Sequence, residues 1–221
     1  MKRIALVHTV KPVLNTFEDR LRAAMPDEEL IIHNLLDEFL AYDPSPDGHG
    51  YFTAENKRRL YNDLMSAQLT GADIIVVTCS TLTPTVTEIR PFMTTPVVAI
   101  DDAMAEAAVQ AGSNIKVVAT AFSTIAPTIA RLQKAAADAG KTITIDSEDN
   151  EPAYCAMKKG DMATHDAMVK EQAASVKGYD AVVLAQASMA HLEADVAAIT
   201  GIPTFSSPDR CVQRVKSLLG L

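Results

Sequence analysis

The stretch Gly71-Ala-Asp-Ile-Ile-Val-Val-Thr-Cys-Ser-Thr-Leu-Thr-Pro84 decides how this chain folds. Its short apolar run, Ile74 to Val77, predicts a buried parallel strand. Polar residues follow the strand, and a helix-like segment comes next. Ligands of open α/β sheets bind beyond the carboxyl ends of the strands. A thiol at this point, Cys79, followed by hydroxyls and backbone N–H groups, is placed for chemistry on an anionic substrate. The alternative is that Cys79 is a small buried hydrophobic residue.

The second half of the chain contains a counterpart of this stretch. Gly71-Ala-Asp73 matches Gly178-Tyr-Asp180 at a separation of 107 residues (178 − 71), and Pro96 matches Pro203 at the same separation (203 − 96). Arg3-Ile-Ala-Leu-Val-His-Thr9 matches Asn114-Ile-Lys-Val-Val-Ala-Thr120 with a shift of 111 residues (114 − 3). An insertion or deletion in a loop explains the small difference. Three matches in one order indicate an internal repeat.

The repeat predicts the fold class. Apolar runs typical of strands alternate with helical periodicity, as in Leu14, Phe17, Leu21 and Met25. Such alternation requires crossover connections and therefore parallel strands. The expected strands are 4–7, 30–32, 74–77, 96–100, 115–119, 142–145, 181–184 and 203–205. We predict an α/β fold of two similar domains related by a pseudo-twofold axis, each with a mainly parallel four-stranded sheet flanked by helices.

The domain boundaries follow from the repeat. We expect residues 1–100 plus 206–221 to form the first domain, which carries Cys79, and residues 101–205 to form the second, which carries Gln186. Pseudo-twofold packing would bring the two sets of strand ends face to face, and the cleft between them is the natural pocket.

Composition excludes several classes of partner. The chain has 28 acidic and 20 basic residues, a net charge of −8, which argues against nucleic acid or an anionic membrane as a partner. Three cysteines have neither metal-type spacing nor the density of a disulfide framework. The apolar run near Met1 is too short for a signal peptide, and no run reaches transmembrane length. We expect a soluble, reduced, cytoplasmic protein without a bound metal.

Several segments carry a resemblance to a known superfamily over nearly the whole chain. They are Val76-Val-Thr-Cys-Ser-Thr81, Val117-Val-Ala-Thr120 with Pro127-Thr128, His165-Asp166, and Val183-Leu-Ala-Gln-Ala-Ser-Met-Ala190. In their order and spacing the chain resembles the aspartate/glutamate/hydantoin racemase superfamily. The resemblance implies an enzyme without cofactors that holds a small carboxylate or hydantoin between two domains. It also implies that a cysteine from each half removes or delivers a proton at the α-carbon.

This chemistry needs particular residue types. A proton next to a carboxylate is very weakly acidic, so the enediolate that forms must be stabilised by preorganised N–H and O–H donors. A thiol suits the proton transfer when nearby dipoles lower its pKa. The candidate substrate-binding donors at strand ends are Thr9, Ser80, Thr81, Thr120, Ser123 and Thr124.

The chain departs from the two-thiol pattern at one position. At the separation of 107 residues, Cys79 corresponds to Gln186, where two-thiol racemases carry a cysteine. A glutamine amide donates and accepts hydrogen bonds but cannot act as a proton base. Gln186, Ala187 and Ser188 are therefore assigned to substrate binding. The wider superfamily includes a one-cysteine decarboxylase of arylmalonates and a maleate cis–trans isomerase.

Two histidines are candidates for a second acid/base. His165 lies in a helical segment and His8 follows the first strand. The alternatives are that His165 is a solvated helix residue and that His8 is an ordinary loop histidine. Cys155 and Cys211 fall in expected helices, where we predict that both pack in the core. The turn-rich loop 43–50, with Tyr42, His49 and Tyr51 near it, is either a flap over the ligand or an exposed connection.

Three function classes remain open. The first is a cofactor-independent isomerase or racemase acting at the α-carbon of a small carboxylate, amino acid or hydantoin, with Cys79 as acid/base or nucleophile. The second is a decarboxylase or cis–trans isomerase that uses a single cysteine. The third is a non-catalytic protein that binds a small anion. In each class the partner is a small anionic molecule, and a homodimer is an open alternative to a monomer.

Overall fold

The computed structural model describes residues 1–41 and 52–221. The expected flap, with Tyr42, His49 and Tyr51, lies outside the described residues. The chain divides into two compact units. Unit 1 contains Met1–Ile100 and Cys211–Leu221, and unit 2 contains Asp101–Arg210. The division proposed from the sequence differs from these units only in residues 206–210.

Unit 1 is built around one parallel sheet of four strands in the order β2-β1-β3-β4. Its strands are β1 (Lys2–His8), β2 (Leu30–Leu36), β3 (Ile74–Val77) and β4 (Val97–Ala99). Its helices are α1 (Lys11–Ala24), α2 (Ala54–Leu69), α3 (Thr83–Ile89) and most of α9 (Pro208–Leu218), with short 3-10 turns η1 (Glu38–Ala41), η2 (Ser80–Leu82) and η3 (Arg90–Phe92).

Unit 2 has a parallel sheet with the equivalent strand order, β6-β5-β7-β8. Its strands are β5 (Asn114–Val118), β6 (Thr144–Glu148), β7 (Ala181–Leu184) and β8 (Thr204–Phe205). Its helices are α4 (Asp102–Ala111), α5 (Ile125–Asp138), α6 (Glu151–Lys158), α7 (Met162–Ala174) and α8 (Glu193–Thr200), with 3-10 turns η4 (Phe122–Thr124) and η5 (Ala187–Leu192). Two similar parallel four-stranded sheets flanked by helices confirm the predicted α/β fold class.

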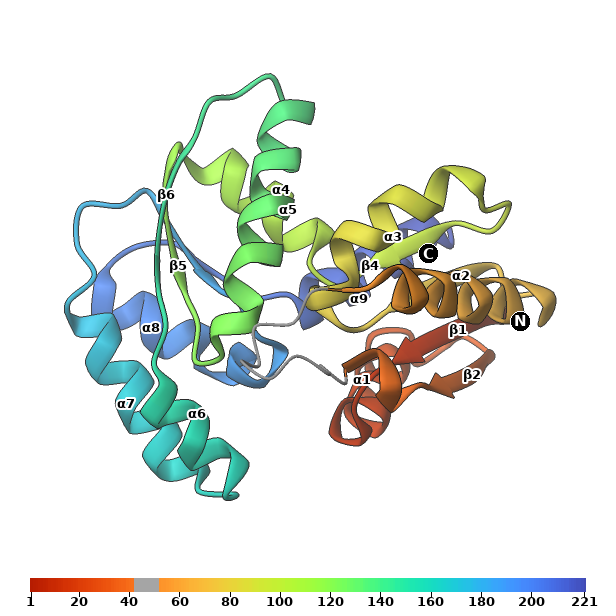
Figure 1. The fold of residues 1–221 in the computed structure, drawn as a ribbon, viewed down its shortest axis with the longest axis horizontal. Coiled ribbons are helices and arrows are strands. Elements are labelled where there is room, and N and C mark those ends of the chain that lie inside the picture. Colours follow the sequence, from red (N-terminus) through yellow and green to blue (C-terminus); the bar gives the residue numbers. More distant parts are fainter. Residues whose placement is uncertain (42–51) are drawn as a thin grey trace. The chain divides into compact units, whose positions relative to one another are not determined.

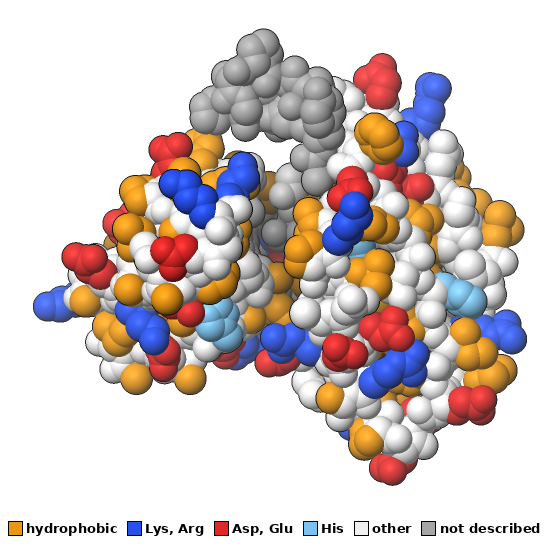
Figure 2. All heavy atoms as spheres, turned by 90° about the horizontal axis from the view of Figure 1, so that it is seen from below, with side chains coloured by type: hydrophobic (Ala, Val, Ile, Leu, Met, Phe, Trp, Pro, Cys, Tyr) orange, Lys and Arg blue, Asp and Glu red, His pale blue; other side chains and the backbone are white. Residues whose placement is uncertain are grey.

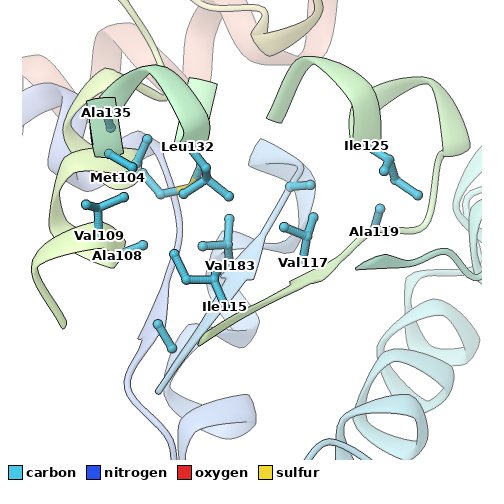
Figure 3. Packing of buried hydrophobic residues seen from close by; sticks show 14 residues of the cluster. Met104, Ala108, Val109, Ile115, Val117, Ala119, Ile125, Leu132, Ala135 and Val183 are labelled. Atoms are coloured by element: carbon cyan, nitrogen blue, oxygen red, sulfur yellow. The ribbon is translucent and has the colours of Figure 1, made fainter. Parts of the chain in front are cut away.

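Helices cover both faces of each sheet, which explains why the central strands are continuous apolar runs. In unit 2, alternate strand residues such as Ile115, Val117 and Val183 pack against α4 and α5, through Met104, Leu132 and others (Figure 3). The intervening strand residues face the opposite layer, which is formed by α6, α7, α8 and η5. Figure 1 shows this sheet with α4 and α5 on one side. In unit 1, α2 and α3 cover one face of the sheet.

Hydrogen bonds at matching positions confirm that the two halves repeat one backbone plan. The amide of Asp73 donates to the carbonyl of Arg3 at 2.8 Å, and the amide of Asp180 donates to the carbonyl of Asn114 at 2.8 Å. Each aspartate also accepts the amide of the same partner on its Oδ2, at 2.8 Å in both units. The alignment of Gly71-Ala-Asp73 with Gly178-Tyr-Asp180 is therefore an alignment of structure.

Two strands, β2 and β6, differ most in extent from the sequence prediction. β2 continues to Leu36, and β6 runs over 144–148 rather than 142–145. β6 is an edge strand with exposed alternate residues, so hydrophobic periodicity ends at Ile145 although pairing continues. Asp146 and Glu148 of this strand both form ion pairs with Lys116 of β5, at 2.9 and 3.2 Å. These charges keep the strand polar where an apolar pattern was expected.

A buried ion pair joins α4 to α5 in unit 2. Arg131 Nε lies 2.7 Å from Asp102 Oδ1, and both side chains are less than a tenth exposed. Arg131 also lies 3.2 Å from Glu106. By contrast, Lys134 and Asp138 on the same helix α5 form an exposed pair. Burial rather than charge alone therefore distinguishes the two pairs.

We predict that Arg131→Ala lowers the free energy of unfolding by about 3–5 kcal/mol, because it leaves the buried carboxylate of Asp102 without the guanidinium that faces it. The matched control, Lys134→Ala, changes it by about 0.5 kcal/mol or less, because exposed i,i+4 pairs contribute little. Urea unfolding of both variants measures the difference. Equal, small losses would show that the Arg131–Asp102 pair is not desolvated.

Candidate active site

Cys79 lies at the carboxyl end of β3, in a short turn between the strand and a helical segment. Its backbone is extended, and its carbonyl accepts the amide of Leu82 at 3.1 Å at the start of η2. Its side chain is half-buried, whereas Cys155 is exposed and Cys211 is buried. The prediction that Cys155 packs in the core is therefore wrong, because its position on α6 faces solvent, whereas that for Cys211 is confirmed. Cys79 alone combines a strand-end position with partial exposure.

Hydroxyl and amide groups surround the same edge of the unit 1 sheet. Ser80 and Thr81 follow Cys79 directly in η2, and both are half-buried. Thr9 follows β1, the strand that pairs with β3, and is buried. The amide of Thr78 donates to the carbonyl of Val7 at 3.0 Å, which ties the two strand ends together. Thr9, Cys79, Ser80 and Thr81 thus lie at the carboxyl ends of two neighbouring strands.

His8 is fully buried beside this turn, and both of its ring nitrogens have partners. Nδ1 lies 2.8 Å from the hydroxyl of Thr78, and Nε2 lies 3.0 Å from Oδ1 of Asn34. Asn34 in turn donates to Glu18 at 2.9 Å. Burial lowers the pKa of His8, and it outweighs the opposite effects of Asn34 and Glu18. This environment favours a neutral His8 that positions Thr78, the residue before Cys79, over an acid/base role.

Gln186 occupies in unit 2 the position that Cys79 occupies in unit 1. Its backbone is extended, and its carbonyl accepts the amide of Met189 at 3.0 Å at the start of η5. Its side chain turns to the end of β5, where Oε1 accepts the amides of Thr120 and Ala121 at 2.6 and 2.9 Å. The hydroxyl of Thr120 also donates to Oε1, at 3.0 Å. Three donors therefore converge on one amide oxygen.

The other candidates of unit 2 lie at the same sheet edge. Ser123 is exposed in η4, and Ala187 and Ser188 are half-buried in η5. The hydroxyl of Thr124 donates to the carbonyl of Ala121 at 2.8 Å, so its hydrogen is already engaged. Because β5 and β7 are neighbours, the structure brings Thr120, Ser123, Gln186, Ala187 and Ser188 to adjoining strand ends.

His165 lies on α7 and belongs to a chain of three side chains. It is fully buried, so the alternative of a solvated helix residue is wrong. Nδ1 of His165 lies 2.8 Å from Asp166 Oδ1, and Nε2 of the half-exposed His191 lies 2.8 Å from Asp166 Oδ2. Burial alone would raise the pKa of Asp166, but the two histidine hydrogen bonds outweigh it and lower that pKa.

The link to His191 was missed from the sequence, because no local pattern joins residues 25 positions apart. The Nε2 of His165 is buried and makes no hydrogen bond with any residue that the structure describes. If Nδ1 carries the proton that Asp166 accepts, Nε2 presents a lone pair, which is the tautomer of a histidine base.

Within residues 1–41 and 52–221, no three or more His, Cys, Asp or Glu side chains are grouped so that they could hold a metal ion. Across the same ranges, no helix has both the length and the apolar character that crossing a bilayer requires. On the face shown in Figure 2, acidic and basic side chains are interspersed.

Fold and site together define a class of protein: a duplicated parallel α/β chain with a thiol at a strand end of one half. The chain belongs to the Asp/Glu/hydantoin racemase family, whose model matches residues 8–215. This confirms the resemblance found in the sequence and supports an enzyme of the racemase superfamily. No protein of curated function matches the chain by sequence.

Solved structures of the family share the fold. An allantoin racemase from Klebsiella pneumoniae is 18% identical, with a TM-score of 0.69 over 100% of this chain and 88% of that one. A glutamate racemase from Francisella tularensis in complex with D-glutamate is 14% identical, with a TM-score of 0.71 over 99% and 81%. An aspartate racemase homologue from Pyrococcus horikoshii is 17% identical, with a TM-score of 0.69 over 100% of both chains. At these identities the likeness shows the fold alone.

The buried His8 gives a prediction about pH. The ordinary pKa of a histidine is 6.5, and that of His8 is lower in the folded state. As the pH falls through 6.5, the unfolded chain therefore takes up a proton that the folded chain refuses, and stability decreases. His8→Asn removes this part of the decrease. Unfolding free energies measured between about pH 8 and about pH 5 test it.

The matched control for this measurement is His33→Asn, because His33 is exposed on β2 of the same unit. This variant keeps the pH dependence of the unaltered protein. If His8→Asn also kept the full pH dependence, the burial of His8 would not be the cause of the acid destabilisation.

Proposed function

We propose that this chain is a cofactor-independent isomerase of the racemase superfamily that acts next to a carboxylate or cyclic amide carbonyl of a small substrate. Cys79 is the group that moves the proton. The position of Cys79 carries the proposal: a half-buried thiol at the end of β3, in a chain of this family. Amino acids and hydantoin-like compounds are the expected substrates, by analogy with the glutamate and allantoin racemases.

The proton transfer involves only Cys79 and the substrate. The thiolate of Cys79 takes the α-proton, and the electron pair of the C–H bond remains on the substrate as an enediolate or enolate. The thiol then returns the proton to carbon. The developing oxygen charge needs fixed donors. Thr9, Ser80 and Thr81 lie at the same sheet edge as Cys79 and are the candidates in unit 1.

One thiol has a stereochemical consequence. The position equivalent to Cys79 holds Gln186, whose amide does not titrate. A single thiol exchanges the α-proton on one face of the carbon, and inversion requires a second acid. His165 and His8 are the candidates for that second group, and the side chains of both are fully buried. The same one-thiol arrangement favours, as a second function, a decarboxylase or cis–trans isomerase that uses Cys79 alone.

The test of the proposal is α-proton exchange. Aspartate, glutamate, allantoin and substituted hydantoins are incubated with the protein in heavy water, and proton NMR follows loss of the α-proton signal. We predict that Cys79→Ser slows exchange at least about 100-fold, the low end for loss of an acid/base group. The matched control, Cys155→Ser, removes an exposed thiol and leaves the rate unchanged.

The outcomes separate the function classes. Exchange with retention of optical rotation indicates one working face, and loss of rotation indicates a second acid. Arylmalonate that loses carbon dioxide, or maleate that isomerises, indicates the second function. Turnover that survives Cys79→Ser would refute the role of this thiol, and binding without any turnover would leave the small-anion-binding protein. The cytoplasmic location and the homodimer remain predictions for fractionation and light scattering.

A further inference from the structure

The orientation of the Gln186 amide is fixed by its contacts. Oε1 lies 2.6 Å from the amide of Thr120, 2.9 Å from the amide of Ala121 and 3.0 Å from the hydroxyl of Thr120. Two of these groups are backbone N–H donors, which cannot face an NH₂ group. These partners therefore exclude the flipped orientation of the amide, in which Nε2 would face the two N–H groups, so it is Oε1 that faces them.

The same contacts leave the amide nitrogen as an oriented donor. Gln186 is half-buried, and Nε2 has no acceptor within residues 1–41 and 52–221. Thr120 is almost fully buried, which holds the anchor rigid. Three hydrogen bonds to the carbonyl oxygen draw electron density from the amide, and such chains strengthen the remaining N–H donors.

The need to satisfy these three donors explains why an acceptor oxygen lies here, but it does not explain why the residue is a glutamine. The three donors of Thr120 and Ala121 need an acceptor, and the carboxylate of a glutamate would satisfy them better than the amide of a glutamine. Glutamine adds two hydrogens that point away from the anchor. Because Oε1 already occupies the donors of Thr120 and Ala121, an incoming oxygen cannot use them. The Nε2 group is a donor that this turn still offers.

We propose that Gln186 is a fixed hydrogen-bond donor, through Nε2, to a carboxylate or acyl oxygen of the bound small molecule. The proposal rests on the proposed function for the class of ligand, a small carboxylate or cyclic amide. Gln186 transfers no proton. It stabilises charge on the substrate oxygen, for which the S–H group of a cysteine would be only a weak donor, and it is thereby a catalytic residue of unit 2.

The sharpest variant is Gln186→Glu. It keeps an oxygen for the three donors, so the free energy of unfolding is retained, but it replaces the NH₂ group by a second acceptor oxygen. We expect kcat/KM for the substrate found by the exchange assay to fall by about 100-fold or more, as for loss of one oxyanion donor. Gln186→Leu is the contrasting variant: it loses activity and stability together, because it also leaves the amides of Thr120 and Ala121 unsatisfied.

A second measurement needs no substrate turnover. The side-chain NH₂ signals of Gln186 are assigned in ¹⁵N-labelled protein by their absence in Gln186→Glu, and sodium acetate is titrated at constant ionic strength, with sodium chloride as the control. We expect acetate to shift these signals in the unaltered protein and equally in Cys79→Ser. Signals that do not move with acetate, or a Gln186→Glu variant with unaltered kcat/KM, would overturn the proposal. If instead only the proposed function is wrong, acetate still shifts the signals of Gln186, but no substrate exchanges its α-proton.

Discussion

Parallel pairing of the central strands is the constraint on which the rest of the structure depends. β1 pairs with β3 and β5 pairs with β7, with all strands of a sheet in one direction. The turns that follow paired strands therefore meet at one edge of each sheet. This is why Thr9 lies near Cys79 in unit 1 and Thr120 lies near Gln186 in unit 2, although about seventy residues separate the members of each pair. A slip in register would separate these residues and remove the site.

The two units show how one backbone plan carries different chemistry. In unit 1, Nδ1 of His8 lies 2.8 Å from the hydroxyl of Thr78, the residue that precedes Cys79. The matching residues of unit 2, Ala119 and Ala185, are small, apolar and buried. The polar network thus belongs to the half with the thiol. Unit 2 instead uses the length of a glutamine side chain, which reaches the donors at the end of β5. A cysteine side chain is too short for the same contact.

Much of the fold was predictable, because short apolar runs mark buried strands and their alternation with helical segments requires parallel sheets. The edge strand β6 was misplaced, since Asp146 and Glu148 carry no hydrophobic signal. Positions at strand ends, such as Cys79 and Gln186, were also predictable. The contacts of their side chains were not, because they depend on rotamers and on distant partners. The link from His165 through Asp166 to His191, and the capture of Gln186 Oε1, are of this kind.

The outermost strands of the two sheets have a consequence for self-association. An exposed strand edge is a template on which another chain can add a strand. Here β4 and β8 span only three and two residues, too short to guide such an addition. On β6, the carboxylates of Asp146 and Glu148 would meet their own copies, and like charges repel. Addition of a further copy is thus hindered at β4, β6 and β8, whereas β2 (Leu30–Leu36), the other strand at the side of the unit 1 sheet, is seven residues long.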